Sequence, residues 1–218
     1  MTGMVEPPAE APRDCPLCPR LVAFRAANRR AQPSWHNGAV TSFGPASARL
    51  LIVGLAPGLK GANRTGRPFT GDFAGDLLYA SLLELGFAQG SYDARPDDNL
   101  VLVDCMISNA VRCVPPENKP TPAEISTCRP FLASRIAAMP RLAAILALGR
   151  IAHDSTLTAL ELRRSAFPFA HGARHDARPG VVLFDSFHCS RYNTNTGKLT
   201  PEMFKSVLRA IRTHLGKV

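Results

Sequence analysis

The chain has 218 residues, of which 45% are hydrophobic and 20% are charged. This length and composition exclude disordered, collagen-like and coiled-coil chains, and they fit one folded domain with a short arm. The 26 Lys and Arg residues outnumber the 17 Asp and Glu residues, and the formal charge of +9 favours polyanionic partners such as nucleic acid.

Residues 1–14 are rich in Pro, Ala and Glu and have no hydrophobic periodicity. We therefore expect a flexible leader over residues 1–14 and a single domain over residues 15–218. The N-terminus lacks the basic and apolar segments of a secretion signal, and no apolar run approaches the roughly 18 residues that span a bilayer. The sequence predicts a cytoplasmic protein without a membrane anchor.

Four short apolar runs have the character of strands that are buried on both faces of a parallel sheet. They are Leu50 to Leu55, Leu100 to Cys105, Ala143 to Leu148 and Val181 to Phe184. Because such strands need helices to cover both faces, these runs predict an α/β fold.

Helical patterns lie between and after these runs, at Phe73 to Leu85, Pro122 to Met139 and Pro201 to His214. Thr121 precedes the second pattern and Glu124 is its third residue, which is the arrangement of a capping box. The alternation of strands and helices predicts a three-layer α/β/α sandwich with a central four-stranded parallel sheet.

A glycine-rich segment from Gly54 to Asp72 follows the first predicted strand. It matches neither the dinucleotide-binding fingerprint nor the phosphate-binding P-loop. Ligands of open α/β sheets bind beyond the carboxyl ends of the strands, so we expect this segment to shape a pocket. Asp72 either caps the next helix or supplies a carboxylate, and Phe69 either fills the local core or stacks on a flat ligand.

Polar residues also follow the second and fourth predicted strands. Asn109 carries a donor and an acceptor that can pair with the edge of a base, and His188 lies at the end of a strand, where histidines often serve chemistry. We expect them to converge with Asp72 at one edge of the sheet. The remaining histidines are expected at surface or structural positions: His36, His153, His171, His175 and His214.

The cysteines form the most specific pattern. Two pairs of thiols, one in a CxxC motif and one flanking a proline-rich loop, predict a metal site that holds either zinc or an iron–sulfur cluster. The predicted ligands are Cys15, Cys18, Cys113 and Cys128. The other two, Cys105 and Cys189, fit buried apolar positions better.

Taken together, these motifs resemble the uracil-DNA glycosylase superfamily, and within it family 5, the type B iron–sulfur enzymes of bacteria and archaea. The resemblance runs from Cys15 to the last helix. Its motifs are Cys15-Pro16-Leu17-Cys18, Gly54-Leu55-Ala56-Pro57-Gly58, Gly66-Arg67-Pro68-Phe69-Thr70-Gly71-Asp72, Asn109-Ala110-Val111-Arg112-Cys113, Cys128 and His188-Cys189-Ser190-Arg191-Tyr192-Asn193.

The resemblance implies a DNA repair enzyme that carries a [4Fe–4S] cluster on the four predicted cysteines. Such an enzyme excises uracil, and other deaminated or damaged bases such as hypoxanthine, from DNA by hydrolysing the N-glycosidic bond. We accordingly expect uracil-containing DNA as partner, a monomer, and a cytoplasmic location at the nucleoid.

Excision of a base requires that the nucleotide be flipped into a pocket. The expected pocket residues are Gly54, Ala56, Pro57, Gly58, Phe69, Asn109 and His188. Asp72 suits the positive charge that develops on the sugar, and His188 suits the negative charge on the departing base, with Asn109 reading the base edge. The expected DNA-binding loop, which fills the gap left in the base stack, is Ser190, Arg191, Tyr192 and Asn193.

Two positions depart from the related motifs. Ala56 stands where the iron–sulfur sister family has an acidic residue, so the carboxylate that handles water is expected at Asp72 instead. Cys189 stands where a proline is often found.

Two other functions explain fewer of these sequence features than a base-excising glycosylase does. A non-catalytic, metal-bound nucleic-acid-binding module leaves Asp72, Asn109 and His188 without a role. A small-molecule hydrolase does not explain the nine surplus positive charges.

Overall fold

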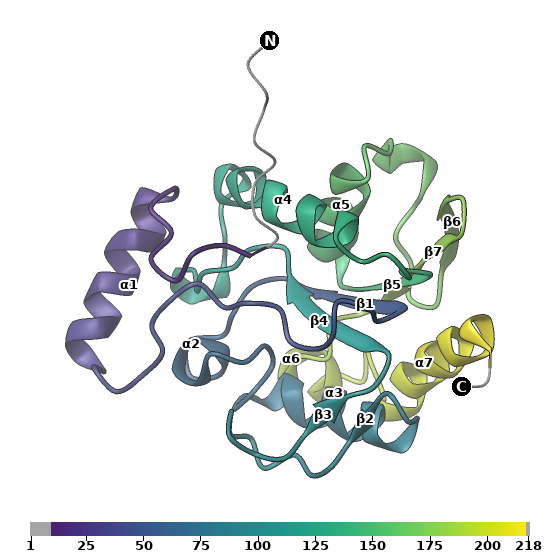
Figure 1. Ribbon diagram of the computed structural model, residues 1–218, viewed down its shortest axis with the longest axis horizontal. Helices are drawn as coiled ribbons and strands as arrows, with labels where there is room; N and C mark the ends of the chain where they lie inside the picture. The colour runs from purple at the N-terminus through teal and green to yellow at the C-terminus, as the bar shows by residue number, and fades with distance from the viewer. Residues whose placement is uncertain (1–9, 217–218) are drawn as a thin grey trace.

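The computed structural model describes residues 10–216, which form a central sheet between two layers of helices (Figure 1). The strands lie in the order β4-β1-β5-β7-β6. Four of them run parallel, namely β1 (Leu50–Gly54), β4 (Cys105–Asn109), β5 (Ala144–Leu148) and β7 (Val181–Ser186). The predicted α/β/α sandwich with four parallel strands is confirmed.

A fifth strand, β6 (Arg174–Arg178), was not predicted. It pairs antiparallel with β7 and forms one edge of the sheet. Of its five residues only Ala177 is buried, because an edge strand shares a smaller part of the core. The predicted total of four strands is therefore one too few, since this polar segment lacks the apolar character of the others.

The second predicted strand, Leu100 to Cys105, has the wrong boundaries. Val101–Leu102 forms β3, which pairs with β2 (Ala88–Gln89) in a separate two-stranded sheet. The chain then turns at Asp104, whose φ of 52° lies in the left-handed region, and β4 begins at the next residue. The Asp104 carboxylate accepts a hydrogen bond of 2.8 Å from the Arg49 backbone N–H, which fixes this turn.

The helices cover both faces of the sheet. α3 (Phe73–Glu84) and α7 (Pro201–Leu215) pack on one face, and α4 (Pro122–Ala137) and α5 (Arg150–Ala159) pack on the other (Figure 1). The predicted capping box is complete, because the Thr121 side chain accepts a hydrogen bond from the Glu124 N–H and the Glu124 side chain accepts one from the Thr121 N–H. Within residues 10–216, none of the helices has both the length and the apolar character that crossing a membrane requires.

The alternation of side chains along β1 explains the apolar run that predicted it. Leu50 and Ile52 join the core beneath α3 and α7, whereas Leu51 and Val53 join the core beneath α4 and α5. Successive side chains of a strand point to opposite faces, so a central parallel strand is apolar throughout. Both hydrophobic cores therefore meet at β1.

The N-terminal part of the described chain contributes one helix and several contacts to the domain. α1 (Pro19–Ala31) lies at the opposite end of the sheet from α7 (Figure 1). The predicted leader extends over residues 1–14, of which residues 1–9 lie outside the described part. Glu10, however, accepts hydrogen bonds from Arg112 and Arg135, at 3.1 and 2.6 Å, and Ala11 is buried. Glu10 and Ala11, which belong to the segment predicted as the leader, therefore contact the folded domain.

The remaining elements are short. They are α2 (Ala62–Thr65), α6 (Arg191–Asn195) and the two 3₁₀ helices Pro116–Asn118 and Arg164–Ala166.

Candidate active site

A cavity of about 650 Å³ opens at the carboxyl ends of the parallel strands. The chain segments that follow β1, β4 and β7 meet there, as expected for an open α/β sheet. The sequence-predicted residues that line it are Ala56, Pro57, Gly58, Phe69, Asp72, Asn109, His188, Ser190 and Arg191. Gly54 is not in the lining and lies behind Phe69 and Asn109.

Phe69 forms one wall of the cavity and is held in an unusual backbone conformation. Its φ is 54°, and its ring stacks on the ring of His188 with a centroid distance of 5.9 Å. A Cβ atom at Gly54 would lie 2.6 Å from this ring, and one at Gly75 would lie 1.7 Å from the Phe69 carbonyl oxygen. The two glycines therefore allow the backbone to approach Phe69 closely, and they fix its position.

Asn109 is the last residue of β4 and pairs in register with Gly54. Its side chain is buried, and its Oδ1 has no hydrogen-bond partner among the described residues. A buried acceptor without a partner costs about 1–3 kcal/mol. A ligand that offers an N–H group would remove this cost, so Asn109 is suited to bind the edge of a ligand.

Asp72 precedes α3 and caps it, because its Oδ1 accepts a hydrogen bond of 3.1 Å from the Gly75 N–H. Its Oδ2 lies over the backbone of Gly58 and Gly61, where added Cβ atoms would come within 2.9 and 2.4 Å. Burial raises the pKa of this carboxyl above its ordinary value. Both sequence interpretations of Asp72 are therefore compatible with the geometry, since the cap uses one oxygen and the other faces the glycine loop.

His188 lies beyond the end of β7, and Asn193 donates a hydrogen bond of 2.8 Å to its carbonyl oxygen. Burial lowers the pKa of His188 to about 4. The ring is consequently neutral at pH 7 and has one N–H to donate. The adjacent Cys189 belongs to the hydrophobic core, as does Cys105, which agrees with the apolar positions predicted for both.

Three residues of the predicted DNA-binding loop, Arg191, Tyr192 and Asn193, are the first residues of the short helix α6. Ser190 is its N-cap, and its hydroxyl accepts a hydrogen bond from the Asn193 N–H. Arg191 lies over the ring of Phe73 at the rim of the cavity, and the side chain of Tyr192 is 74% exposed.

Two lining residues with polar side chains were not singled out from the sequence, Lys60 and Asn118. Lys60 lies within the glycine-rich segment, and Asn118 lies in the proline-rich loop that precedes α4. Both segments carry a signal of function, but no residue-specific pattern distinguishes these two positions within them.

The four predicted metal ligands line a common small pocket between α1, α4 and the segment after β4. All are free thiols, and two of their sulfurs accept hydrogen bonds: Cys128 Sγ from the Arg112 N–H at 3.2 Å and Cys113 Sγ from Arg25 at 3.8 Å. The two sequence pairs thus come together in space. Donors directed at sulfur are characteristic of thiolates that bind metal centres.

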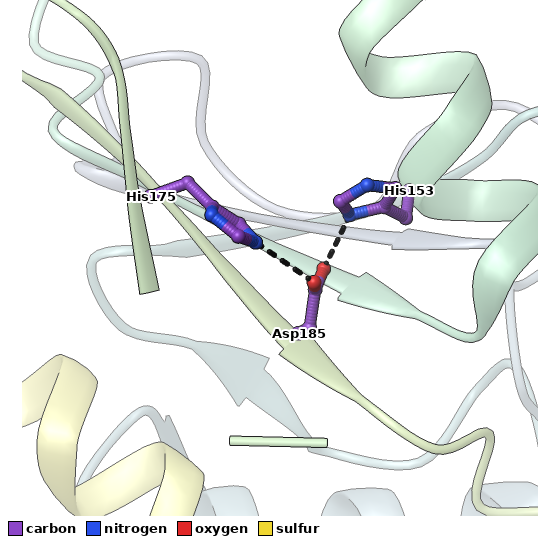
Figure 2. Close-up of side chains that lie close together, drawn as sticks. All are labelled: His153, His175 and Asp185. Carbon is purple, nitrogen blue, oxygen red and sulfur yellow. Dashed lines mark hydrogen bonds and ion pairs between the residues drawn. The ribbon is translucent and has the colours of Figure 1, made fainter. Parts of the chain in front are cut away.

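A second cluster joins His153 of α5, His175 of β6 and Asp185 of β7 (Figure 2), with one ligand atom of each within 4.8 Å of the others. His153 Nδ1 lies 2.7 Å from the Asp185 carboxylate, and Nε2 lies 2.8 Å from the Phe167 carbonyl oxygen. Both partners are acceptors, so both ring nitrogens donate. Burial is the largest single influence and opposes the charge of His153, but the hydrogen bond and charge of Asp185, the Phe167 carbonyl and the charge of Asp154 together outweigh it and raise the pKa. The cluster is a buried ion pair, which agrees with a structural role for these histidines.

The fold defines an α/β protein with a cavity at the carboxyl end of its sheet, and the lining of this cavity combines an aromatic ring with hydrogen-bonding side chains. A family model described as the uracil DNA glycosylase superfamily matches residues 41–212. The chain belongs to the uracil-DNA glycosylase superfamily.

Several relatives cover nearly the whole chain. The type-5 uracil-DNA glycosylase of Thermus thermophilus is 46% identical over 89% of this chain and 90% of its own length. The type-5 enzyme of Pyrobaculum aerophilum is 38% identical over 93% of this chain and 90% of its own. A type-4 uracil-DNA glycosylase of Pyrobaculum aerophilum is 32% identical, but the match covers only 66% of each chain. These matches confirm the family resemblance inferred from the motifs.

Proposed function

We propose that this protein is a DNA repair glycosylase that hydrolyses the N-glycosidic bond of deoxyuridine in DNA. The observation that carries the proposal is the combination of a stacking face, Phe69, with the unpartnered Oδ1 of Asn109 in one cavity. A flipped base fits between these groups because its faces are apolar and its edge is polar.

Asn109 accounts for the choice of base. Uracil has an N–H between two carbonyl groups, and this N–H matches the unpartnered Oδ1 of Asn109. Cytosine has a lone pair at the same position, which would face the Asn109 oxygen and leave it unpaired. Hypoxanthine, another product of deamination, has an equivalent N–H beside a carbonyl group. We therefore infer that uracil is the main substrate and hypoxanthine a secondary one.

Asp72 and His188 address the charges that develop as the bond breaks. The electron pair of the glycosidic bond leaves with the base, so the base becomes anionic and the sugar becomes cationic. The neutral ring of His188 donates its N–H to the departing base, and the Asp72 carboxylate stabilises the sugar and orients the water that attacks it. The water loses one proton, and the base takes one up.

The surface around the cavity suits DNA. The net charge of +9 favours phosphate contacts, and we infer that Tyr192, which is exposed at the start of α6, fills the gap left by a flipped nucleotide. We propose that the enzyme acts as a monomer, because the residues given roles in the chemistry line a single cavity. A chromosomal substrate implies a cytoplasmic location at the nucleoid.

We further infer that Cys15, Cys18, Cys113 and Cys128 hold a [4Fe–4S] cluster. A single tetrahedral zinc ion, with bonds of about 2.3 Å, would bring its four sulfurs to within about 4 Å of one another. Among the described residues no three of these sulfurs lie within 4.8 Å of one another, although they share one pocket. The spacing therefore suits a larger centre with several metal atoms. The cluster would join α1 to the segment after β4, and no chemical step is assigned to it.

The test of function is release of free base from 30-nucleotide duplexes that each carry one lesion. We expect release from uracil in U:G pairs, slower release from hypoxanthine in I:T pairs, and none from cytosine in C:G pairs. Alkali cleaves the resulting abasic sites, and the fragments are sized on a gel. If the protein binds these duplexes but releases no base, it is a binding module and the proposed function is wrong.

The cluster is tested by metal analysis of protein prepared without oxygen. We expect about four iron atoms per chain and a brown colour, and we expect Cys128→Ser to lose both and to lower the melting temperature. Cys105→Ser is the matched control, since this thiol is equally buried but lies in the main core. It should keep its iron. One zinc ion per chain, without iron, would contradict the assignment.

A further inference from the structure

A second hollow, of about 770 Å³, lies beside the cavity on the other side of α2. Its lining is basic and aromatic, and includes Arg13, Arg64, Arg95, Trp35 and His36. The acidic residue of this lining is Asp93. Neither Arg13 nor Arg64 has a carboxylate oxygen within 4.0 Å among residues 10–216, and the Arg13 guanidinium donates to the His36 carbonyl oxygen. We call this hollow the Trp35 groove.

The Trp35 groove is separated from the candidate active site by the short helix α2. Gly61, at the start of α2, lines the cavity, whereas Arg64, in the same short helix, lines the groove. A Cβ atom at Gly71 would lie 2.6 Å from Arg64 Nη2, so this guanidinium packs against the backbone next to Asp72. A strand that leaves the cavity across this backbone therefore enters the groove.

One wall of the groove is held in place by paired backbone and side-chain groups. The His36 N–H donates to the Arg64 carbonyl oxygen and the Asn37 N–H donates to the Asn63 carbonyl oxygen, both at 3.0 Å. The Asn63 side chain also donates to the side-chain oxygen of Asn37 at 3.0 Å. Trp35, which is partly exposed, is thus attached to a fixed support.

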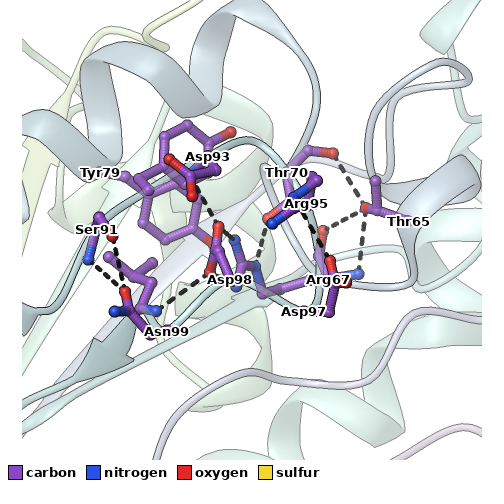
Figure 3. A network of polar contacts seen from close by, with 12 residues as sticks. Thr65, Arg67, Thr70, Tyr79, Ser91, Asp93, Arg95, Asp97, Asp98 and Asn99 are labelled. Atoms are coloured by element: carbon purple, nitrogen blue, oxygen red, sulfur yellow. Dashed lines mark hydrogen bonds and ion pairs between the residues drawn. The ribbon is translucent and has the colours of Figure 1, made fainter.

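The opposite wall is the segment that carries Asp93 and Arg95, and Figure 3 shows the network beneath it. Asp98 accepts two hydrogen bonds from the Arg67 guanidinium, at 2.6 and 2.7 Å, and a third from the Asp93 N–H at 3.1 Å. The side chains of Arg67 and Asp98 are 6% and 0% exposed. Arg95 itself extends into solvent, 3.7 Å from Asp97. The groove therefore has walls held by hydrogen bonds and exposed arginines at its rim.

We propose that the Trp35 groove binds unpaired nucleotides that flank the lesion on the damaged strand. An indole face stacks on any base, and arginines at the rim pair with successive phosphates, which is how single strands are bound without regard to sequence. A base in a duplex is already stacked and paired, so the indole selects unpaired DNA. The proposal rests on the proposed function and adds to it a preference for lesions in single-stranded segments.

Trp35 is the only tryptophan of the chain, so the tryptophan fluorescence of the protein reports on binding in the groove. Titration with a 12-nucleotide oligothymidylate, which contains no uracil, should quench the tryptophan fluorescence to saturation. The double variant Arg64→Ala/Arg95→Ala should bind at least about tenfold more weakly. Each phosphate contact to a single strand contributes about 0.7 to the slope of log K against log salt. The double variant loses two such contacts, so the magnitude of its slope should be smaller than that of the parent by about 1.4.

The matched control is Arg163→Ala/Arg178→Ala, which removes two exposed arginines outside the groove lining. Its affinity and salt slope should equal those of the parent. Trp35→Ala should weaken binding by at least about fivefold in the fluorescence anisotropy of a labelled oligonucleotide, whereas Trp35→Phe, which keeps a stacking face, should restore most of it.

The outcomes separate this proposal from the proposed function. Saturable quenching without base release from any substrate would contradict only the glycosylase activity. Base release without quenching by the oligonucleotide, or equal weakening in the control double variant, would overturn the groove assignment. Quenching by thymidine monophosphate with the same affinity as by the oligonucleotide would also overturn it, because the groove would then be a mononucleotide site.

Discussion

Asp72→Asn is expected to slow single-turnover release of uracil by at least about a hundredfold, while affinity for DNA changes by less than about twofold. Asparagine keeps the size of the side chain and removes its charge. Loss of one preorganised electrostatic group from a buried site commonly costs a factor of 10² to 10³ in rate. The measurement is a rapid-quench time course with enzyme in excess.

The same variant separates catalysis from capping. Asparagine caps a helix about as well as aspartate, so α3 should keep its stability. Asp76→Asn is the matched control, because it removes an equal charge from the exposed side of the first turn of α3. It should release uracil at the parent rate. If folded Asp72→Asn stays within about threefold of the parent, Asp72 serves only as a cap.

The pH dependence of release follows from the same groups. Burial raises the pKa of Asp72 above 3.8, and the ionised form is the active one. The rate should therefore fall as the pH falls through this raised pKa, and the slow residual rate of Asp72→Asn should lack that acid limb. Burial lowers the pKa of His188 to about 4, so its ring is neutral from pH 6 to pH 8 and should cause no change there. A limb centred near pH 6.5 would contradict a neutral His188.

Arg67→Met is expected to lower the free energy of unfolding by about 3–5 kcal/mol. Arg67 holds the pKa of Asp98 at about 2, and both side chains are almost completely buried. Removing the guanidinium leaves a buried carboxylate without its ion-pair partner, with only the Asp93 and Leu100 N–H groups as donors. Methionine keeps most of the apolar stem, so the loss reports the charge pair and not a cavity. The measurement is urea unfolding monitored by circular dichroism.

Arg95→Met is the matched control for that prediction. Arg95 pairs with Asp97 in the same segment, but both side chains are exposed. Its denaturation midpoint should not change. The double variant Arg67→Met/Asp98→Asn should recover part of the lost stability, because asparagine leaves no buried charge. A single variant as stable as the parent would show that Asp98 is compensated by other groups.

Much of the fold follows from local patterns. The apolar run at Leu50 predicts β1, and the Thr121 capping box predicts the start of α4, because periodicity and capping depend on residues within one or two turns of chain. The prediction of one strand from Leu100 to Cys105 is wrong because a local pattern does not include contacts with distant residues. A left-handed turn at Asp104 divides this run, and this turn is stabilised by Arg49, which is distant in the sequence.

In the candidate site, too, local patterns predict some features and the tertiary structure decides others. Glycine-rich and polar segments after strands indicate where a ligand binds, and the sequence alone singles out Phe69, Asp72, Asn109 and His188. The orphaned oxygen of Asn109 and the neutral state of His188 depend on burial, which is a property of the assembled molecule.

The sequence by itself determined the class of fold, the family, the cysteine pairs and the segments that form the cavity. These depend on residue type and on short spacings along the chain. Only the tertiary structure decided that Glu10 binds Arg112 and Arg135, that Arg67 and Asp98 form a buried pair, and that Trp35 and Arg64 line one groove. Such contacts join residues far apart in sequence, and packing of the whole chain selects them from many alternatives that local propensity leaves equal.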